Sequence, residues 1–279
     1  MLDTSLAPRY YRLILSPERE MFAPLAVEAI EASLRDACIG HHIIYFPVVT
    51  STMDVARQEA ERGSEEGIVV VAEEQTAGRG RLGRRWLSSA GQNLYFSVLL
   101  YPSLWVCRRL GAAAPVAVLR AIRQVCGLSP TLKWPNDILL GEKKVSGILI
   151  ETAIQDAEVR HAIVGIGINA GLDPEAHPEV ASTATSLAAE LGKPIPREEL
   201  LQAVLAELAL IYAHLKGWGD VWEEWQSSLE TLGKEVRVRW GEQVEEGVAE
   251  TVDSEGNLLL RRADGTLVTL AGGEVTLHV

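Results

Sequence analysis

The spacing of apolar and polar positions predicts alternating helices and strands over about the first 230 residues. Helical spacing predicts helices over 25–38, 52–62, 110–126, 197–216 and 219–230. Apolar, aromatic or β-branched runs predict strands over 43–49, 67–74, 93–102, 131–140, 143–153 and 161–170. A hydroxyl side chain, Ser51 or Thr52, is placed to cap the second helix, and Gly141-Glu142 makes the tight turn of a hairpin. Strands and helices interleaved in this way indicate an α/β (α+β) domain with a mixed sheet.

The pattern changes after about residue 232. Five short alternating runs follow, separated by glycine turns: EVRVRW, EEGVAETVD, NLLLRR, TLVTL and EVTLHV. Five short strands in so few residues predict a small β-barrel of the SH3 type. The expected organisation is an N-terminal arm and helix packed on the core over 1–41, a large α/β domain over 42–231 and a small all-β domain over 232–279.

The composition is that of an ordinary folded protein. The chain has 279 residues, 47% of them hydrophobic and 23% charged, enough to bury a large core without disulfides. Cys38, Cys107 and Cys126 are far apart and lack metal-ligand spacing, so we expect free thiols. The first residues are too mixed for a signal peptide and no stretch could span a bilayer, so the expected location is the cytoplasm, without membrane contact.

Charge is distributed unevenly along the chain. The net charge of −12 argues against a general DNA- or RNA-binding surface. No acidic residue occurs between Glu74 and Asp137, however, and nine of the 26 cationic residues fall in this window: Arg79, Arg81, Arg84, Arg85, Arg108, Arg109, Arg120, Arg123 and Lys133. A positive segment on an acidic protein suits a small anionic ligand such as a nucleotide; the alternative is a chance run of solvated arginines.

The segment GRGRLGRRW, Gly78 to Trp86, carries the strongest chemical signal. Its G-x-G-x-x-G spacing suggests a dinucleotide fold, but that fingerprint opens a helix and is followed by an acidic residue about twenty positions later. Here the segment leads into a strand, and no acid appears before Asp137. The glycines instead let the backbone close on a ligand, and Arg79 and Arg81 can bind phosphate and carboxylate oxygens with paired donors.

The segment KWPNDILL puts three polar side chains, Lys133, Asn136 and Asp137, inside an otherwise buried hairpin. Burying them unpaired would cost a few kcal/mol each, roughly. They therefore pair with one another or serve a ligand, and the sequence leaves both interpretations open.

Two further motifs lie in predicted strands. KKVSGILIE carries Lys144, which could neutralise a carboxylate during acyl-phosphate chemistry, and Gly147, which permits close approach to the backbone, whereas Lys143 is expected in solvent. The two glycines of GIGIN indicate backbone packed against another group, and Asn169 at the strand end could read a base or sugar.

In this order, the four motifs GRGRLGRRW, KWPND, KKVSGILIE and GIGIN resemble those of biotin protein ligases. The resemblance covers nearly the whole chain from about residue 42 and includes the small C-terminal domain. It implies a mixed-sheet catalytic domain of the biotin/lipoate ligase type over 42–231, which binds biotin and ATP, and an SH3-like domain over 232–279. The family's STN sequence is Ser51-Thr52-Met53 here, so the Asn and its polar contact are replaced.

The resemblance also implies the reaction. Biotin and ATP, with Mg²⁺, give biotinyl-5′-AMP and pyrophosphate, and a lysine of a biotin carboxyl carrier protein then takes the biotin and releases AMP. No side chain forms a covalent intermediate, so catalysis rests on positioning and charge. The catalytic residues implied are Arg81, Lys144 and Asp137. The biotin-binding residues implied are Ser51, Thr52, Met53, Gln75, Gly78, Arg79, Gly80, Arg81, Lys144 and Gly147. The ATP-binding residues implied are Arg79, Arg81, Arg84, Trp86, Asn93, Lys133, Asn136 and Asn169; the metal ligands are not identified.

Partners follow from the same resemblance. A homodimer is expected, and no operator binding, because the roughly forty residues before the core are too few for the winged helix of some family members. Two alternatives remain. One is a lipoate ligase or lipoyl/octanoyl transferase, against which the dense arginine loop and the C-terminal barrel argue. The other is a regulatory protein that senses biotin or a nucleotide without turnover, against which the charged hairpin argues; AMP production distinguishes it.

Overall fold

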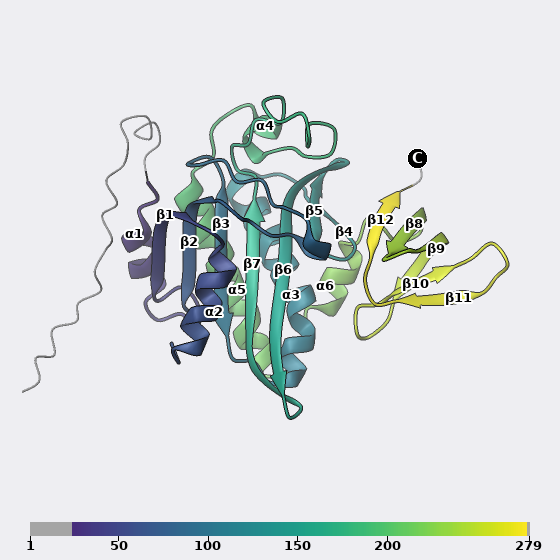
Figure 1. The fold of residues 1–279 in the computed structure, drawn as a ribbon, viewed down its shortest axis with the longest axis horizontal. Helices are drawn as coiled ribbons and strands as arrows, with labels where there is room; N and C mark the ends of the chain where they lie inside the picture. The colour runs from purple at the N-terminus through teal and green to yellow at the C-terminus, as the bar shows by residue number, and fades with distance from the viewer. Residues whose placement is uncertain (1–23, 278–279) are drawn as a thin grey trace, which may run out of the picture.

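The computed structural model describes residues 24–277, which form two sheets with flanking helices (Figure 1). The helices are α1 (Val27–Ser33), α2 (Thr52–Glu61), the 3-10 turn η2 (Arg81–Gly83), α3 (Leu104–Cys126), α4 (Leu187–Leu191), α5 (Arg197–Lys216) and α6 (Trp222–Ser227). The strands are β1 (Ile43–Val49), β2 (Val69–Gln75), β3 (Leu94–Leu100), β4 (Thr131–Lys133), β5 (Asp137–Leu140), β6 (Lys143–Gln155), β7 (Glu158–Ile168), β8 (Glu235–Trp240), β9 (Gln243–Val252), β10 (Leu258–Arg261), β11 (Leu267–Leu270) and β12 (Glu274–Leu277).

The larger sheet has the strand order β1-β2-β3-β7-β6-β5-β4. Strands β1 and β2 are parallel and the other neighbours are antiparallel, so the sheet is mixed, as predicted. The parallel pair brings the ends of β1 and β2 to one edge, where Val49 lies opposite Gln75. Because α2 begins just after β1, the residues Ser51 and Thr52 lie at this same edge.

Alternate strand residues pack into two layers. Val69 and Val71 of β2 join the main core with α3 and α5, whereas Val70 points to the other face and packs with Met53 of α2. Figure 1 shows α3 and α5 behind the sheet and α2 in front of it. The long helix α3 is buried along most of its length, as its nearly continuous apolar sequence predicts. The front face beside α2 is the side on which the cavity described below is found.

The smaller sheet is antiparallel, in the order β11-β10-β9-β8-β12, and confirms the all-β unit predicted after residue 232. Trp134, in the turn between β4 and β5, attaches this unit to the larger sheet. Its backbone N–H donates to Thr231 Oγ1 at 2.9 Å, and its buried indole N–H donates to the carbonyl of Gly256 at 2.9 Å. The small sheet is therefore fixed beside the β4 edge (Figure 1).

Several local expectations were wrong. The segment 131–140 is not one strand, because Trp134–Asn136 turns the chain and β4 pairs back onto β5. Helix α3 begins at Leu104 rather than residue 110 and is capped by Ser103, whose Oγ accepts from the Val106 N–H at 3.4 Å. Ser51 occupies the N-cap position of α2 but makes no capping hydrogen bond. The short helix α4 was not predicted.

Much of the predicted N-terminal arm lies outside the described residues. Its helix α1 packs against α5 and β1. Just before α1, the backbone N–H of Leu25 donates to the Glu73 carboxylate at 2.9 Å. Glu73 also forms a 2.6 Å ion pair with Arg197, and the two side chains are only 10% and 11% exposed. This pair joins the N-terminal segment, β2 and the start of α5.

The three cysteines are free and partly buried, as expected. Within residues 24–277, no helix has the length and apolar character needed to cross a membrane.

Candidate active site

A cavity of about 510 Å³ lies over β6 and β7, beside the edge where β1 and β2 end. Of the residues expected from the sequence, these line it: Ser51, Thr52, Met53, Gln75, Arg79, Gly80, Arg81, Arg84, Trp86, Lys133, Asn136, Asp137, Lys144, Gly147 and Asn169. Residues that are far apart in the sequence thus line the same cavity: more than 110 positions separate Ser51 from Asn169.

The structure does not bring Gly78 and Asn93 into the cavity lining. Gly78 begins the segment 78–86, called here the Gly-Arg loop, and a Cβ atom on Gly78 would come within 2.9 Å of the Trp86 carbonyl oxygen. Asn93 is fully buried, and its Oδ1 accepts from the backbone N–H groups of Gly171 and Leu172 at 3.2 and 3.0 Å. Asn93 therefore holds the backbone at residues 171–172, and Gly78 contributes its carbonyl, which accepts from the Trp86 N–H.

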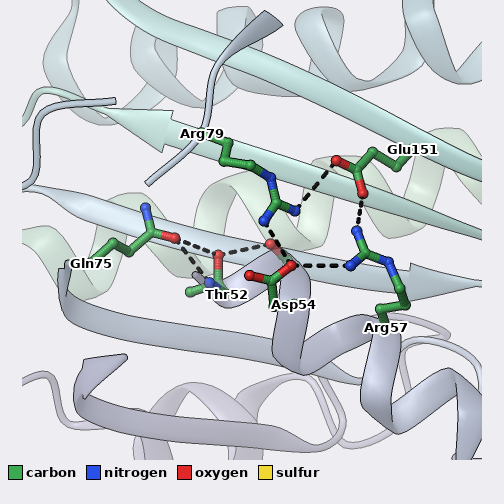
Figure 2. A network of polar contacts seen from close by, with 7 residues as sticks. Thr52, Asp54, Arg57, Gln75, Arg79 and Glu151 are labelled. Atoms are coloured by element: carbon green, nitrogen blue, oxygen red, sulfur yellow. Dashed lines mark hydrogen bonds and ion pairs between the residues drawn. The ribbon is translucent and has the colours of Figure 1, made fainter. Parts of the chain in front are cut away.

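One end of the cavity is small and polar. Gln75 Oε1 accepts from the backbone N–H of Thr52 at 2.9 Å and from its hydroxyl at 3.1 Å, and that hydroxyl lies 2.8 Å from Ser97 Oγ (Figure 2). Met53 packs beneath, against Gly165, where a Cβ atom would lie 2.7 Å from the Met53 sulfur. The Thr52 hydroxyl is thus used to orient Gln75, and a thioether lies where the resemblance places Asn.

Two glycines form a flat floor without side chains. Gly147 of β6 and Gly167 of β7 are direct cross-strand partners. The Trp86 indole lies on them: a Cβ atom on Gly167 would come within 2.5 Å of the ring, and one on Gly147 within 2.7 Å. Any larger residue would push the indole off the sheet, which explains the glycines of GIGIN and KKVSG. The buried Trp86 Nε1 has no hydrogen-bond partner within the described residues.

The Gly-Arg loop is a short hairpin. Arg79 bridges to Arg85, the Gly80 N–H donates to the Arg84 carbonyl at 2.7 Å, and the Trp86 N–H donates to the Gly78 carbonyl at 2.9 Å. The tip of the hairpin lies in solvent. This backbone pairing fixes the directions of the loop side chains, so that Arg79 reaches Asp54 of α2 and Arg81 reaches Asn136 in the cavity.

Two cations at the other end of the cavity differ in their partners. Arg81 donates to the amide oxygen of Asn136 at 3.0 Å and makes no ion pair within residues 24–277. Burial lowers the pKa of Arg81, opposed by the field of Asp137. Lys144 pairs with Asp137 at 2.6 Å, and its Nζ lies 5.2 Å from the centre of the Trp86 ring. Within the described residues, Arg81 is therefore a desolvated positive charge whose hydrogen bond is to a neutral amide and not to a carboxylate.

The three polar residues of KWPND do not pair with one another. Asn136 holds Arg81 and also donates to the Ile148 carbonyl at 2.7 Å, while Asp137 pairs with Lys144. Lys133 lines the cavity. The hairpin thus contributes a cation, an amide and a carboxylate to a single site.

Only part of the acid-free segment surrounds the cavity. Four arginines lie on α3 instead and form ion pairs with acids of α5, α6, the segment before α6 and the turn between β9 and β10: Arg108, Arg109, Arg120 and Arg123. For Arg108, Arg120 and Arg123 the alternative of solvated arginines holds, whereas the Arg109 side chain is only 12% exposed and lies against the rings of Trp105 and Trp222. Five cations of the segment line the cavity, but Arg79 pairs with Asp54 and Glu151 and Arg84 pairs with Glu274, so the local positive field comes mainly from Arg81, Arg85 and Lys133.

Two parts of the wall were missed in the sequence. One lies at residues 180–184, where the Thr183 carbonyl accepts from the Lys144 N–H at 2.9 Å. The other is Gly273–Val275 of the small sheet, where Glu274 forms an ion pair with Arg84. The adjacent Gly272 was a usable signal, because a Cβ atom there would lie 2.9 Å from the Arg81 guanidinium.

Comparisons with known proteins identify the family. The sequence model of the Biotin/lipoate A/B protein ligase family matches residues 45–169, and that of the Biotin protein ligase C terminal domain matches residues 231–277. The chain is 35% identical over 260 residues to the bifunctional ligase/repressor BirA of Bacillus subtilis, covering 91% of this chain and 78% of that protein. It is 34% identical over 263 residues to the biotin–[acetyl-CoA-carboxylase] ligase of Mycobacterium tuberculosis, covering 89% and 96%. The solved biotin protein ligase of Aquifex aeolicus, in complex with biotin and ATP, superposes with a TM-score of 0.71 at 32% identity, covering 85% of this chain and 98% of that one. With two family models matched along its length and relatives this similar, the chain belongs to the biotin protein ligase family.

Proposed function

We propose that this protein is an ATP-dependent biotin protein ligase, which makes biotinyl-5′-AMP and transfers biotin to a lysine of a biotin carboxyl carrier protein. The observation that carries the proposal is Arg81, a cation that burial desolvates and that, within residues 24–277, forms a hydrogen bond with the neutral amide of Asn136 and no ion pair. Holding such a charge in a protein is costly unless an anion joins it. Biotin, ATP and the adenylate are all anions.

The polarity of the cavity fits a ligand with a polar ring, an apolar body and an anionic tail. Thr52 and Gln75 offer donors and acceptors to the ureido ring, and Met53 and Gly165 give an apolar surface beside them. Arg81 and Lys144 lie at the anionic end.

In the first step, a carboxylate oxygen of biotin attacks the α-phosphorus of ATP and pyrophosphate leaves. Lys144 first neutralises the carboxylate and then, with Arg81, stabilises the negative charge that develops at the α-phosphate. Asp137 fixes the position of the Lys144 ammonium through their 2.6 Å ion pair. In the second step, the amine of the carrier lysine attacks the acyl carbon and AMP leaves. The loop and Trp86 keep water away from the mixed anhydride.

The proposal includes Mg²⁺, which would bind together with ATP. Mg²⁺ is bound in such sites by one or two carboxylates and the substrate phosphates, with several waters retained. Within residues 24–277 no group of three or more His, Cys, Asp or Glu side chains could hold a metal ion, so no dedicated cage is offered. Asp137, which lines the cavity near Arg81 and Lys144, fits that lighter requirement and would supply the carboxylate for the ion, which would neutralise phosphate charge.

The remaining expectations are part of the same proposal: a homodimer, a cytoplasmic location, no operator binding, and division of the chain into 1–41, 42–231 and 232–279. Sedimentation, cell fractionation and promoter-fragment binding at physiological salt test the first three.

The test of function is pyrophosphate release from ATP and Mg²⁺ with biotin, lipoate, octanoate or no acid. Release with biotin alone, followed by a mass increase on one lysine of a carrier domain, is the expected result. Release with lipoate instead would assign the protein to the lipoate ligases, and binding without release or AMP would leave a sensor.

A further inference from the structure

Four charged side chains form a closed ring beside the cavity (Figure 2). Arg79 donates to Asp54 at 2.7 Å and to Glu151 at 3.4 Å. Arg57 donates to the same oxygen of Asp54 at 3.1 Å and to the second oxygen of Glu151. Two cations thus alternate with two anions, and the formal charge of the ring is zero.

The ring joins three elements that each carry part of the site. Asp54 and Arg57 lie one turn apart on α2, which begins at Thr52. Glu151 lies on β6, the strand that carries Lys144 and Gly147. Arg79 is in the Gly-Arg loop, so its guanidinium connects that loop both to the helix at the polar end of the cavity and to the strand at the cationic end.

The two alternate arginines of the loop therefore differ in their surroundings. Burial alone would lower the pKa of Arg79, but its hydrogen bonds and charge contacts with Asp54 and Glu151 raise it. Burial lowers the pKa of Arg81, which has no such pair. The charge of Arg79 is neutralised inside the protein, while that of Arg81 remains available to a ligand.

We propose that Asp54, Arg57 and Glu151 are positioning residues, which hold Arg79 as the anchor of the Gly-Arg loop so that Arg81 faces the ligand. Arg79 then acts through the ring and not by binding phosphate or carboxylate with its guanidinium. The expected changes in KM and in pyrophosphate release rest on the proposed function. The expected change in trypsin cleavage does not.

The test compares Arg57→Gln with Arg62→Gln. Both arginines belong to the α2 region, Arg62 following its last residue, and each pairs with a carboxylate three residues earlier, but Arg62 pairs with Glu59, outside the ring. For Arg57→Gln we expect the KM for biotin and ATP to rise roughly threefold to tenfold, because two partly exposed ion pairs are lost. We also expect more pyrophosphate released per biotin transferred, because a loosened loop admits water to the adenylate. Arg62→Gln should match the wild type in both.

The direction in which KM changes in the Asp54→Asn variant shows whether Arg79 anchors the loop or contacts the ligand. If Arg79 is an anchor, Asp54→Asn raises KM as Arg79→Met does, and the double variant is no worse than Arg79→Met alone. If Arg79 binds the ligand directly, Asp54→Asn frees a cation for the anion, so KM stays the same or falls. That second result would overturn the proposal.

Trypsin cleavage without any ligand gives a readout that needs no activity. The loop contains Arg81, Arg84 and Arg85, so Arg57→Gln should be cleaved there faster than Arg62→Gln, with both variants melting within a few degrees of the wild type. Equal cleavage of the two folded variants would refute the anchor role. Absence of pyrophosphate release from the wild type would instead refute the proposed function and leave the cleavage test intact.

Discussion

Replacing Gly167 with alanine tests whether the glycine floor sets the position of Trp86. The new Cβ atom would lie about 2.5 Å from the indole, whereas carbon atoms in contact lie about 3.5 Å or more apart. The ring must therefore retreat by about 1 Å, since the β7 backbone is fixed by pairing on both sides. A displacement of this size in a catalytic site costs on the order of 100-fold in rate. We expect kcat/KM for biotin adenylation to fall between about tenfold and 100-fold.

Stability should change much less than activity. Overpacking costs about 1–3 kcal/mol, and removing a glycine from a strand returns about 0.5–1 kcal/mol. The melting temperature of a protein of this size then falls by only a few degrees. Gly111→Ala is the control, because Gly111 is exposed on α3 and its Cβ would meet nothing within 4 Å. That variant should gain up to about 1 kcal/mol and keep full activity. A Gly167→Ala enzyme with wild-type kcat/KM would show that Trp86 is not held where its contacts matter.

Three further changes have distinct expected results. Lys144→Gln should lower the rate of pyrophosphate release by about 100- to 1000-fold, whereas Lys143→Gln, at an exposed neighbour, should not; equal losses would contradict the charge argument. Arg197→Met leaves the buried Glu73 carboxylate without its cationic partner and should cost about 3 kcal/mol in urea unfolding, because the hydrogen bond from the Leu25 N–H remains; Glu73→Gln should restore part of this in the double variant. Burial alone would raise the pKa of Glu66, but hydrogen bonds from a tyrosine, a lysine and a backbone N–H lower it. Its contribution to stability is therefore present above the unfolded pKa near 4.5 and lost as the pH falls through the lowered value, so Glu66→Gln should destabilise at neutral pH but not in strong acid.

The elements that shape the cavity were largely predictable from the sequence, because each carries a local signal. The apolar runs of β1, β2 and β7 and the helical periodicity of α5 differ clearly from the polar residues beside them. A glycine inside a strand, such as Gly147, indicates that another group packs closely against the backbone. The four motifs also named most of the residues that meet in the cavity.

What could not be predicted depended on long-range pairing. The turn at residues 134–136 has a local signal in Pro135 and Asn136, but only the pairing of β4 with β5 shows that the chain reverses there within the sheet. Asn93 has the polar character of a ligand contact, yet it is used to hold the backbone of Gly171 and Leu172. The ring partners of Arg79 lie 25 and 72 positions away, and no spacing rule joins them.

The contribution of Gly273–Val275 to the cavity wall bears on how this architecture can evolve. The C-terminal unit is matched by a sequence model of its own, as an interchangeable module would be. Yet it closes one side of the cavity, pairs Glu274 with Arg84, and receives the indole N–H of Trp134. A recombination event that exchanged the unit as a block would have to supply all three contacts at once. The interface between the two sheets is therefore part of the cavity itself. Substitutions on one side of the interface constrain which substitutions the other side accepts.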